Sequence, residues 1–429
     1  MAEAGVLGYG ANSAIMKSNF FIGLFAASLC GFLVALSFPT ILFGRLFPDL
    51  GFLAWVALIP LLLITRRLSL GGTFLLAFIA GFIANATTRY WVFIAVHSYG
   101  KFSLGWSIVV VLLSYGVLAV LFSLPFVVAN VVLRWSPPFR VGIFAVAWVA
   151  AEYLKNVFPF GGLPWANLAY TQSHFLPILQ IADLTGVYGI VFLITLVNAV
   201  IAELILQRDV RRLLPLCAVT SILVAIVLGY GWYQLTTDGS AKGDNVNIAL
   251  IHGSRPIGTR LRRETMKESQ RRSIELSQEA VVKGADVVIW PEASFYRALG
   301  FDEQGIMRKI GALGVPLIVG STSVEGDRRR NSALFYDRQG NLTATYQKMH
   351  LVPLGEYLPW PINMSSLVPL NPGGHRYVAG REIVPFPVSP ALRLGMMICY
   401  EDLFPEIARA NVLAGANALG VILSDGWFT

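Results

Sequence analysis

The stretch RLGMMICYEDLFPE, Arg393 to Glu406, decides which fold we expect for the C-terminal half of the chain. Its apolar first half favours a buried strand and leads directly to Cys399, which two carboxylates and a proline follow. This order predicts a strand that ends in a sharp turn and lifts the Cys399 side chain out of the sheet. A thiol in such a turn can act as a nucleophile when a base and a cation stand nearby, because the thiolate is the attacking form.

Two upstream stretches supply a candidate base and a candidate cation. Glu292 follows the strand-like VVIWP in VVIWPEAS, and Lys348 ends the strand-like LTATYQK. A carboxylate at a buried strand end can serve as a general base near neutral pH, and a buried ammonium can stabilise an oxyanion. The alternatives are a surface glutamate in a turn and a solvated lysine. We expect the catalytic arrangement, with Glu292, Lys348 and Cys399 at the ends of three strands of one domain.

The composition indicates a membrane protein. Of the 429 residues, 55% are hydrophobic and only 14% are charged. The net charge of +8 does not indicate a nucleic-acid partner, because many basic residues lie in short loops between apolar runs, where they report membrane orientation. Three cysteines are too few for a disulfide framework, and Cys30 and Cys217 lie in apolar runs as inert core residues. Because CxxC, HExxH and GxxxxGK[ST] motifs and histidine clusters are all missing, we expect no metal, no cofactor and no NTP-driven activity.

Seven apolar segments are predicted as membrane spans, for which roughly 20 residues suffice. They are Phe20–Phe38, Gly51–Thr65, Thr73–Val96, Trp106–Leu133, Val141–Val157, Gly186–Leu206 and Leu213–Trp232. The first segment has a lysine before it, as a signal peptide would. Its apolar run is too long for a signal peptide, however, and we interpret it as an uncleaved anchor.

The basic residues between these segments predict the orientation. With the N-terminus inside, eight lie on the inner side and three on the outer side: Lys17, Arg66, Arg67, Arg134, Arg140, Arg208, Arg211 and Arg212 against Arg45, Lys101 and Lys155. By the positive-inside rule the N-terminus is cytoplasmic, and an odd number of spans places everything after Trp232 on the opposite side. In a bacterium that side is the periplasm.

Three features near the outer ends of these spans are open to two interpretations. The loop Phe158 to Leu184 is aromatic and apolar, so it is either an aromatic belt at the lipid interface or a platform that leads lipid toward the outer domain. Arg89 and Glu152 lie within or near spans, where ionisable groups are rare and usually functional. Alternatively, Arg89 snorkels to the interface.

From Gly243 onward the pattern changes to that of an α/β domain. Short apolar strands alternate with helical segments, among them a strand at Val246 to Ile251 and an amphipathic helix from Arg260 to Lys283. NSALFYD and LTATYQK are separated by four residues and predict a hairpin. After Cys399 we expect a helix from Phe404 to Leu413 and a further strand in ALGVILS. The predicted domains are therefore a helical membrane domain, residues 1–235, and an outer α/β domain, residues 243–429.

Several motifs together resemble a known family. WPEAS with Glu292, YQKMHLVPLGEYLP with Lys348 and Glu356, and MMICYED with Cys399 resemble the Glu-Lys-Cys motifs of the nitrilase, or carbon-nitrogen hydrolase, superfamily. The seven-span region, with YWVFIAVHSYG and LPWANLAYTQS, is similar to the membrane-bound apolipoprotein N-acyltransferase branch of that superfamily. The resemblance implies an αββα sandwich on the periplasmic face of the inner membrane.

The resemblance also implies a reaction and a role for each site residue. Cys399 would be the nucleophile, Glu292 the general base and Lys348 the cation that stabilises the tetrahedral intermediate. Glu356 would support Lys348 or the proton transfer of the cysteine, and Tyr400 and Glu401 would line the site beside the nucleophile. The reaction would be ping-pong, moving an acyl chain from a phospholipid, typically phosphatidylethanolamine, to the thiol as a thioester and then to the α-amino group of a diacylglyceryl cysteine of an apolipoprotein. A monomer without cofactor would suffice.

Two alternatives remain at this stage. The same triad would serve a membrane-anchored amidase that uses water as acceptor. Because the family continues beyond the position matched by Thr429, with more of the sandwich and a closing span, we expect either a C-terminally truncated fragment or a naturally short enzyme. A catalytically inactive lipid- or lipoprotein-binding fragment is therefore the second alternative. A transporter is disfavoured, since the spans lack a paired-charge pathway.

Overall fold

The chain divides into two compact units. The computed structural model describes residues 3–39, 41–42, 45–46, 50–99, 102–207, 210–237, 245–252, 263–296, 311–325, 328–353, 355–357 and 376–424. A helical unit comprises Met1–Tyr90 and Val109–Gly239, and a sheet unit comprises Trp91–Ile108 and Ser240–Thr429. The expected boundaries at 235 and 243 remain a prediction.

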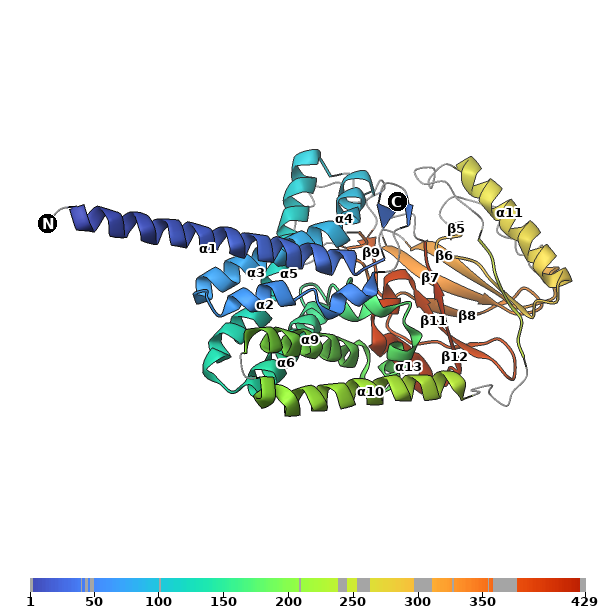
Figure 1. The fold of residues 1–429 in the computed structure, drawn as a ribbon. Coiled ribbons are helices and arrows are strands. Elements are labelled where there is room, and N and C mark those ends of the chain that lie inside the picture. The colour runs from blue at the N-terminus through green and yellow to red at the C-terminus, as the bar shows by residue number, and fades with distance from the viewer. Residues whose placement is uncertain are drawn as a thin grey trace. The chain divides into compact units, whose positions relative to one another are not determined.

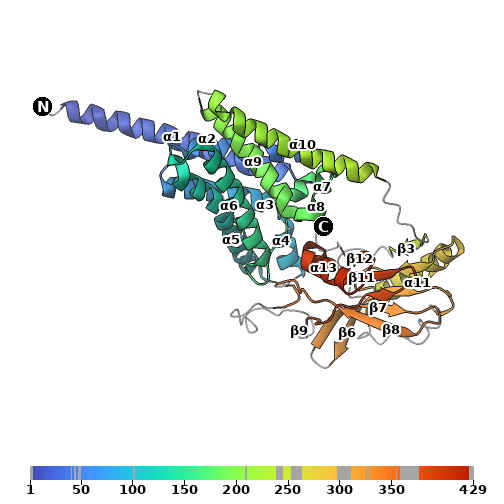
Figure 2. The ribbon, with the colours of Figure 1, turned by 90° about the horizontal axis from the view of Figure 1, so that it is seen from below.

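Long apolar helices build the helical unit (Figures 1 and 2). Its helices are α1 (Glu3–Leu36), α2 (Ile59–Thr65), α3 (Leu70–Thr88), most of α5 (Leu104–Val131), α6 (Pro137–Val157), α7 (Leu176–Leu179), α8 (Ala182–Thr185), α9 (Val187–Leu206) and α10 (Leu214–Thr236). A short antiparallel pair, β1 (Ile41–Leu42) and β2 (Arg45–Leu46), follows α1. Helix α4 (Trp91–Ile94) and a π-helical turn at Ala95–Tyr99 are assigned to the sheet unit.

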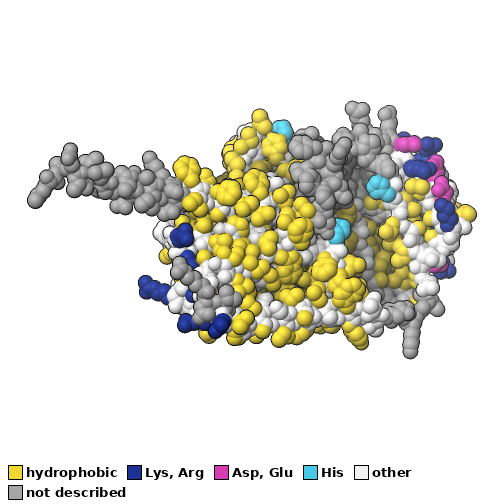
Figure 3. All heavy atoms as spheres, in the orientation of Figure 1, with side chains coloured by type: hydrophobic (Ala, Val, Ile, Leu, Met, Phe, Trp, Pro, Cys, Tyr) yellow, Lys and Arg dark blue, Asp and Glu magenta, His cyan; other side chains and the backbone are white. Residues whose placement is uncertain are grey.

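Each of the seven predicted spans contains helix, but the helices differ in length. In the described part of the chain, four are long and apolar enough to cross a membrane: Leu70–Thr88, Leu104–Arg134, Val187–Leu206 and Arg211–Thr236. Three apolar helical stretches are shorter: Phe20–Leu36, Gly51–Thr65 and Leu176–Thr185. Figure 3 shows hydrophobic side chains over the visible face of the helical unit and Lys and Arg side chains gathered at one end, as expected for a domain surrounded by lipid.

The segment Gly51–Thr65 is a broken helix whose free backbone groups are satisfied from elsewhere. A 3₁₀ turn ends before Leu58, and Asn198 of α9 bridges the break, accepting from the Leu58 N–H at 2.9 Å and donating to the Ala54 carbonyl at 2.9 Å. The Gln172 amide donates to the carbonyl at the start of the segment, also at 2.9 Å. Irregular backbone is tolerated inside a membrane when buried protein groups replace the missing hydrogen bonds.

Two sheets form the core of the sheet unit. The larger has β3 (Ile248–Leu250), β4 (Val287–Ile289), β6 (Leu317–Glu325), β7 (Arg328–Tyr336) and β8 (Leu342–Gln347) in that order, with β5 (Phe295–Tyr296) on β6 and β9 (Arg376–Tyr377) on β7. The smaller has β10 (Phe386–Pro387), β11 (Arg393–Ile398) and β12 (Ala418–Ile422). The predicted hairpin is confirmed as β7 and β8, which pair antiparallel across four residues.

Alternation along the strands gives the larger sheet two buried faces. Val287 and Ile289 belong to a core shared with Phe386 and Met396 of the smaller sheet. The intervening Val288, with Trp290, faces the other way and packs in a core with α11 (Arg263–Val282). Since successive side chains of a strand point to opposite faces, β4 is covered on both sides.

Helix α13 (Pro405–Leu413) covers the smaller sheet. Its Asn411 packs so closely on β11 that a side chain at Gly395 would meet the Asn411 Cβ at 2.7 Å. The order of layers is therefore α11, larger sheet, smaller sheet, α13, which confirms the predicted αββα sandwich.

Candidate active site

Cys399 occupies a strained turn at the end of β11, as the sequence predicts. The strand ends at Ile398 and a 3₁₀ turn covers Cys399–Leu403. Cys399 itself has a positive φ of 54°, a conformation that costs a residue with a side chain about 1–3 kcal/mol. Strain of this kind persists where the surrounding structure holds it, and here it turns the half-buried thiol out of the strand.

Glu292 lies in a tight turn directly after β4. Its side chain is 7% exposed, and the next residue, Ala293, has a positive φ of 53°. The turn packs against Gly320 of β6, where an added Cβ would meet the Pro291 carbonyl oxygen at 2.3 Å. The absence of a side chain at Gly320 therefore lets the Glu292 turn lie against the sheet.

Lys348 follows β8 and is more deeply buried than either of the carboxylates near it, Glu292 and Glu356. Its side chain is 1% exposed, and its Nζ lies 2.9 Å from Glu356 Oε2, 3.1 Å from Glu356 Oε1 and 4.0 Å from Glu292 Oε1. The surface alternative is thus wrong for Lys348, and it is wrong for Glu292 as well. Two carboxylates share one ammonium, so this buried group keeps one negative charge in excess while the thiol is protonated.

Asn331 is a site residue that the sequence analysis did not single out. Its Nδ2 donates to Glu292 Oε1 at 2.7 Å and to Glu356 Oε1 at 3.3 Å, so one amide ties the two carboxylates together. The backbone carbonyl of Asn331 accepts from the Lys348 backbone N–H at 2.8 Å. The available signal was a carboxamide in a strand that is otherwise apolar toward its end, NSALFY, because a buried polar side chain in a strand needs partners.

The electrostatics favour a protonated thiol beside a basic carboxylate. Burial and the Glu292 carboxylate raise the pKa of Cys399 to about 12, although Lys348 acts in the opposite direction. Burial also raises the pKa of Glu292, against the lowering effect of Lys348. Burial alone would lower the pKa of Lys348, but Glu356 and Glu292 outweigh it and raise that pKa. The Cys399 thiol hydrogen-bonds to the Glu292 carboxylate, which is therefore placed to take its proton.

The carboxylate of Glu401 is fully buried and hydrogen-bonds to backbone N–H groups, an arrangement that we call the clamp. It accepts from the backbone N–H groups of Ile398 at 2.8 Å, Met349 at 2.6 Å and His350 at 3.1 Å. The Tyr346 hydroxyl lies 2.9 Å from both of its oxygens. The clamp joins the end of β11, just before the thiol, to the chain just after Lys348.

Glu356 and Tyr400 are in contact with Lys348 and Cys399, respectively. Glu356 holds Lys348 and also accepts from the Val352 backbone N–H at 2.8 Å, so its own loop fixes it. The ring of Tyr400 is buried edge-on against Phe404, with the centroids 4.8 Å apart. Its backbone N–H bonds to the Cys399 sulfur and lowers the pKa of that thiol. Tyr400 therefore contributes its backbone to the site, while its side chain contributes packing.

The described residues offer no metal-binding group of three or more His, Cys, Asp or Glu side chains. The paired carboxylates Glu292 and Glu356 are bridged by an ammonium and an amide. The arrangement is suited to acyl transfer through a thiol, with a base and a cation in place.

Comparisons with known proteins show which families the chain resembles. Residues 30–200 match the family of the apolipoprotein N-acyltransferase N-terminal domain, and residues 263–429 match the carbon-nitrogen hydrolase family. Apolipoprotein N-acyltransferase of Geobacter metallireducens is 36% identical over 431 residues, which cover 94% of this chain and 77% of the relative. That of Allorhizobium ampelinum is 31% identical over 328 residues, which cover 73% of this chain and 60% of the relative. Among solved structures, an amidase of Nesterenkonia AN1 from the nitrilase superfamily is 20% identical over 43% of this chain and 66% of its own, with a TM-score of 0.32.

Proposed function

The chain belongs to the apolipoprotein N-acyltransferase family, and we propose that it transfers a fatty acyl chain from a membrane phospholipid to the α-amino group of an apolipoprotein's diacylglyceryl cysteine. The observation that carries the proposal is the joint placement of Cys399, Glu292 and Lys348. The Cys399 thiol, on a strained backbone, hydrogen-bonds to the buried Glu292 carboxylate, and the buried Lys348 ammonium lies 4.0 Å from that carboxylate. The names of the relatives supply the substrate class.

In the first half-reaction Glu292 takes the proton of the Cys399 thiol while the sulfur attacks an ester carbonyl of the phospholipid. The carbonyl oxygen becomes an oxyanion, for which the ammonium of Lys348 and the Tyr400 backbone N–H are the available donors. When the intermediate collapses, the C–O bond to glycerol breaks and the leaving alkoxide takes the proton from Glu292. The products are a lysophospholipid and a Cys399 thioester.

In the second half-reaction the α-amino group of the apolipoprotein attacks the thioester carbonyl. Glu292 accepts a proton from the attacking nitrogen, and the same donors stabilise the second oxyanion. The C–S bond breaks, Glu292 returns its proton to the sulfur, and an amide is formed. The raised pKa of Glu292 suits it to both proton transfers, because a base is most effective when its pKa lies near the working pH.

Glu356, Asn331 and Glu401 act through the triad. Glu356 and Asn331 hold Lys348 and Glu292 at fixed positions, and Glu401 fixes the turn of Cys399 relative to the chain after Lys348. Positioning of this kind matters because transfer between two large substrates requires the reacting atoms to be aligned in both steps.

We further propose that the seven apolar segments act as membrane spans and place residues 243–429 on the periplasmic side of the bacterial inner membrane. The basic residues on one side of these segments and the lipid nature of both substrates support this orientation. Alkaline phosphatase fused after Thr429 should be active and a cytoplasmic fluorescent protein fused there should be dark. The reverse pattern would exclude the proposed reaction in the periplasm.

The test of the reaction is acylation of the full chain by phosphatidylethanolamine that carries a labelled acyl group. We expect a hydroxylamine-sensitive adduct that Cys399→Ala abolishes and the matched thiol variant Cys217→Ala retains. Addition of a synthetic diacylglyceryl-cysteine peptide should move the label to the peptide amine. If Cys399→Ala keeps the adduct, another residue is the nucleophile. If the label is released as free fatty acid whether or not peptide is present, the protein is a hydrolase of the amidase type.

A further inference from the structure

Two clusters of buried charge lie in the described part of the helical unit, and they differ in how the charges are balanced. In the first, Glu203 of α9 pairs with Arg66 at 2.6 Å and with Arg140 of α6 at 2.8 Å. The Arg66 side chain is 28% exposed, so the surplus positive charge of this cluster reaches solvent. This first cluster is an ordinary charge network at one end of the helical unit.

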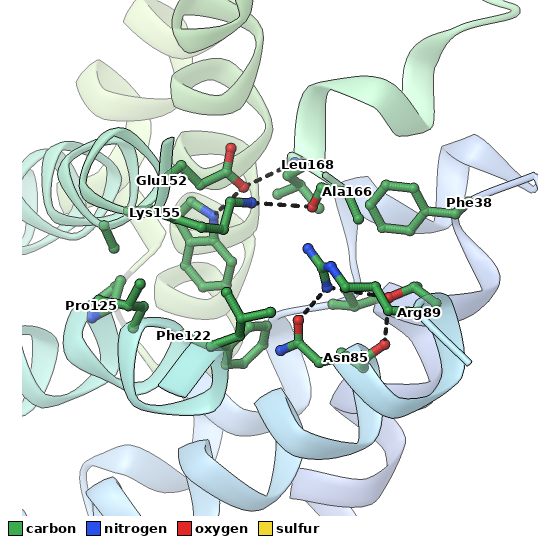
Figure 4. Close-up of a pocket in the computed structure, with 16 residues that line it drawn as sticks. Phe38, Asn85, Arg89, Phe122, Pro125, Glu152, Lys155, Ala166 and Leu168 are labelled. Carbon is green, nitrogen blue, oxygen red and sulfur yellow. Dashed lines mark hydrogen bonds between the residues drawn. The ribbon is translucent and has the colours of Figure 1, made fainter. Parts of the chain in front are cut away.

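The second cluster consists of Arg89, Glu152 and Lys155, which line a cavity of about 60 Å³ (Figure 4). Arg89 follows the last residue of α3, and the other two lie near the end of α6. All three are buried, at 6%, 7% and 8% exposure, so Arg89 does not snorkel and Lys155 is not the loop residue expected from the sequence. Arg140 of the first cluster lies in the first turn of α6, and Lys155 lies in its last turn. Helix α3, which is roughly 29 Å long at 1.5 Å per residue, begins after Arg66 and ends before Arg89. The two clusters therefore lie at opposite ends of the unit.

All three side chains bond to the backbone of one loop, Leu163 to Leu168. Arg89 donates to the Trp165 carbonyl, Lys155 to the Ala166 carbonyl at 3.4 Å, and Glu152 accepts from the Leu168 N–H at 2.9 Å. The middle of the loop is thus packed inside the helical unit, whereas an aromatic belt would lie at its surface. Ala166 also has a positive φ of 50°, so the backbone is strained at this point as it is at Cys399.

These contacts leave the cluster incomplete. No ion pair joins any two of Arg89, Glu152 and Lys155 in the described structure, and Arg89 Nε and Glu152 Oε2 are buried without a hydrogen-bond partner. Two cations and one carboxylate leave one positive charge in excess, and unlike Arg66 neither cation reaches solvent. An uncompensated buried charge is strongly unfavourable in a membrane domain, so the cavity is suited to an anion.

The remaining walls indicate which anion fits. The cavity is also lined by Val34, Phe38, Leu118, Leu121 and Phe122, which are apolar side chains of the adjoining segments. Figure 4 shows Arg89 facing Glu152 and Lys155 across the cavity, with Phe38 and Phe122 at its sides. A single water needs roughly 10–15 Å³, so the space admits a small tetrahedral group as well as several waters. A ligand with an anionic group next to an apolar body matches both kinds of wall.

We propose that this cavity binds the phosphate group of a membrane phospholipid, with Arg89 and Lys155 as the donors and the glycerol and acyl portion along the apolar wall. The separation of the two clusters supports a lipid, because roughly 22 Å along α6 and 29 Å along α3 is most of the roughly 30 Å hydrocarbon thickness of a bilayer and places the cavity near headgroup depth. The proposal does not depend on the acyl-transfer reaction: the bound lipid has a place in the helical unit whether or not it is the acyl donor.

The test is equilibrium binding to the purified full chain in phosphate-free detergent micelles, with native mass spectrometry as readout. The probes are phosphatidylglycerol, diacylglycerol with the same acyl chains, and inorganic phosphate. We expect one phosphatidylglycerol to bind preferentially over diacylglycerol. Lys155→Gln and Arg89→Gln should each weaken it about 10- to 100-fold, the usual effect of losing one charge-assisted hydrogen bond. Lys155→Arg should restore binding.

Glu152→Gln separates an anion site from a cluster that only fastens the loop. The glutamine still accepts from the Leu168 N–H but removes a negative charge, so an anion site should bind phosphatidylglycerol at least as tightly as before. Arg66→Gln, which disturbs the other cluster, is the matched control and should leave binding unchanged. Unchanged binding in Lys155→Gln, equal binding of diacylglycerol, weakening by Glu152→Gln, or binding of inorganic phosphate without lipid would each overturn the proposal. Because the readout is bound lipid, inactivity of the enzyme would not affect the outcome.

Discussion

Replacement of Glu401 by glutamine should destabilise the sheet unit by several kilocalories per mole. The change keeps the shape of the side chain but turns one acceptor oxygen into a donor. Its two oxygens accept from three backbone N–H groups and one hydroxyl, so either orientation of the amide leaves a backbone N–H facing an NH₂ group. The least harmful orientation places the NH₂ at the Ile398 N–H, since the Tyr346 hydroxyl can rotate and accept instead.

The size of the effect follows from that contact. Loss of one hydrogen bond to a charged group costs about 1.5–3 kcal/mol, and a buried N–H left unsatisfied costs about 1–3 kcal/mol more. We therefore expect a loss of about 2.5–6 kcal/mol. For a domain of this size each kilocalorie lowers the melting temperature by about 2–4 °C, which gives a decrease of roughly 5–24 °C.

The assay is thermal unfolding of the detergent-solubilised protein followed by intrinsic fluorescence, with Glu406→Gln as control. Glu406 lies on α13, and its side chain is 60% exposed, so the same chemical change should shift the melting temperature by no more than about 2 °C. Tyr346→Phe removes one donor and leaves the three backbone contacts, so its melting temperature should lie between those of Glu401→Gln and Glu406→Gln. A Glu401→Gln protein that melts with the Glu406→Gln control would refute the clamp.

Three further predictions concern the triad and its support. Formation of the acyl adduct should decline as the pH falls through the raised pKa of Glu292, because the protonated carboxyl cannot accept the thiol proton. Glu356→Gln should move this decline to lower pH, since Glu356 raises the pKa of Glu292. A decline at the same pH in both proteins, measured as adduct formation against pH, would contradict this prediction. Cys399 should react with iodoacetamide at pH 8 at least roughly tenfold more slowly in the folded protein than after unfolding, because a pKa of about 12 in place of 9.0 leaves little thiolate. Peptide mass spectrometry measures the rate of alkylation. Equal rates in the folded and unfolded protein would show that the thiol is ionised. Gly320→Ala should destabilise the protein by about 1–3 kcal/mol and slow adduct formation, because its Cβ would enter the Glu292 turn. Gly116→Ala is the control, since an added Cβ there meets nothing within 4 Å. Equal melting temperatures of the two variants would refute the close approach of Gly320 to the Glu292 turn.

The sheet unit was largely predictable because its signals are local. The continuous apolar runs before Glu292 and Cys399, the polar helix that became α11 and the four-residue turn between β7 and β8 are each recognisable within a few residues. The pairing of the two sheets through β4 and β11 required the resemblance, since strand periodicity shows that a face is buried and not what covers it. Asn331 and the clamp of Glu401 were missed as partners because their contacts join residues 39 and 55 positions apart.

The helical unit was harder to predict because hydropathy measures length and composition only. Hydropathy does not show that the predicted span Gly51–Thr65 is interrupted: it consists of a 3₁₀ turn and the short helix α2, held by side chains of α9 and of the loop before it. Lys155 was counted as a loop residue because charge was expected outside the spans. It is buried at the end of α6, where the backbone of the Leu163 to Leu168 loop provides the acceptor.

The dependence of this broken segment on Asn198 has a consequence for how the protein is made. Leu58 and Asn198 are 140 positions apart, so a growing chain presents the segment to the membrane long before its hydrogen-bond partner has been synthesised. Until α9 emerges, the free backbone groups around Leu58 must remain with water, the translocation machinery or headgroups, because the hydrocarbon layer offers no substitute. The helical unit therefore completes its first half only after translation has passed residue 198, and a ribosome that stalls before that point leaves a chain whose early segment cannot settle in the bilayer.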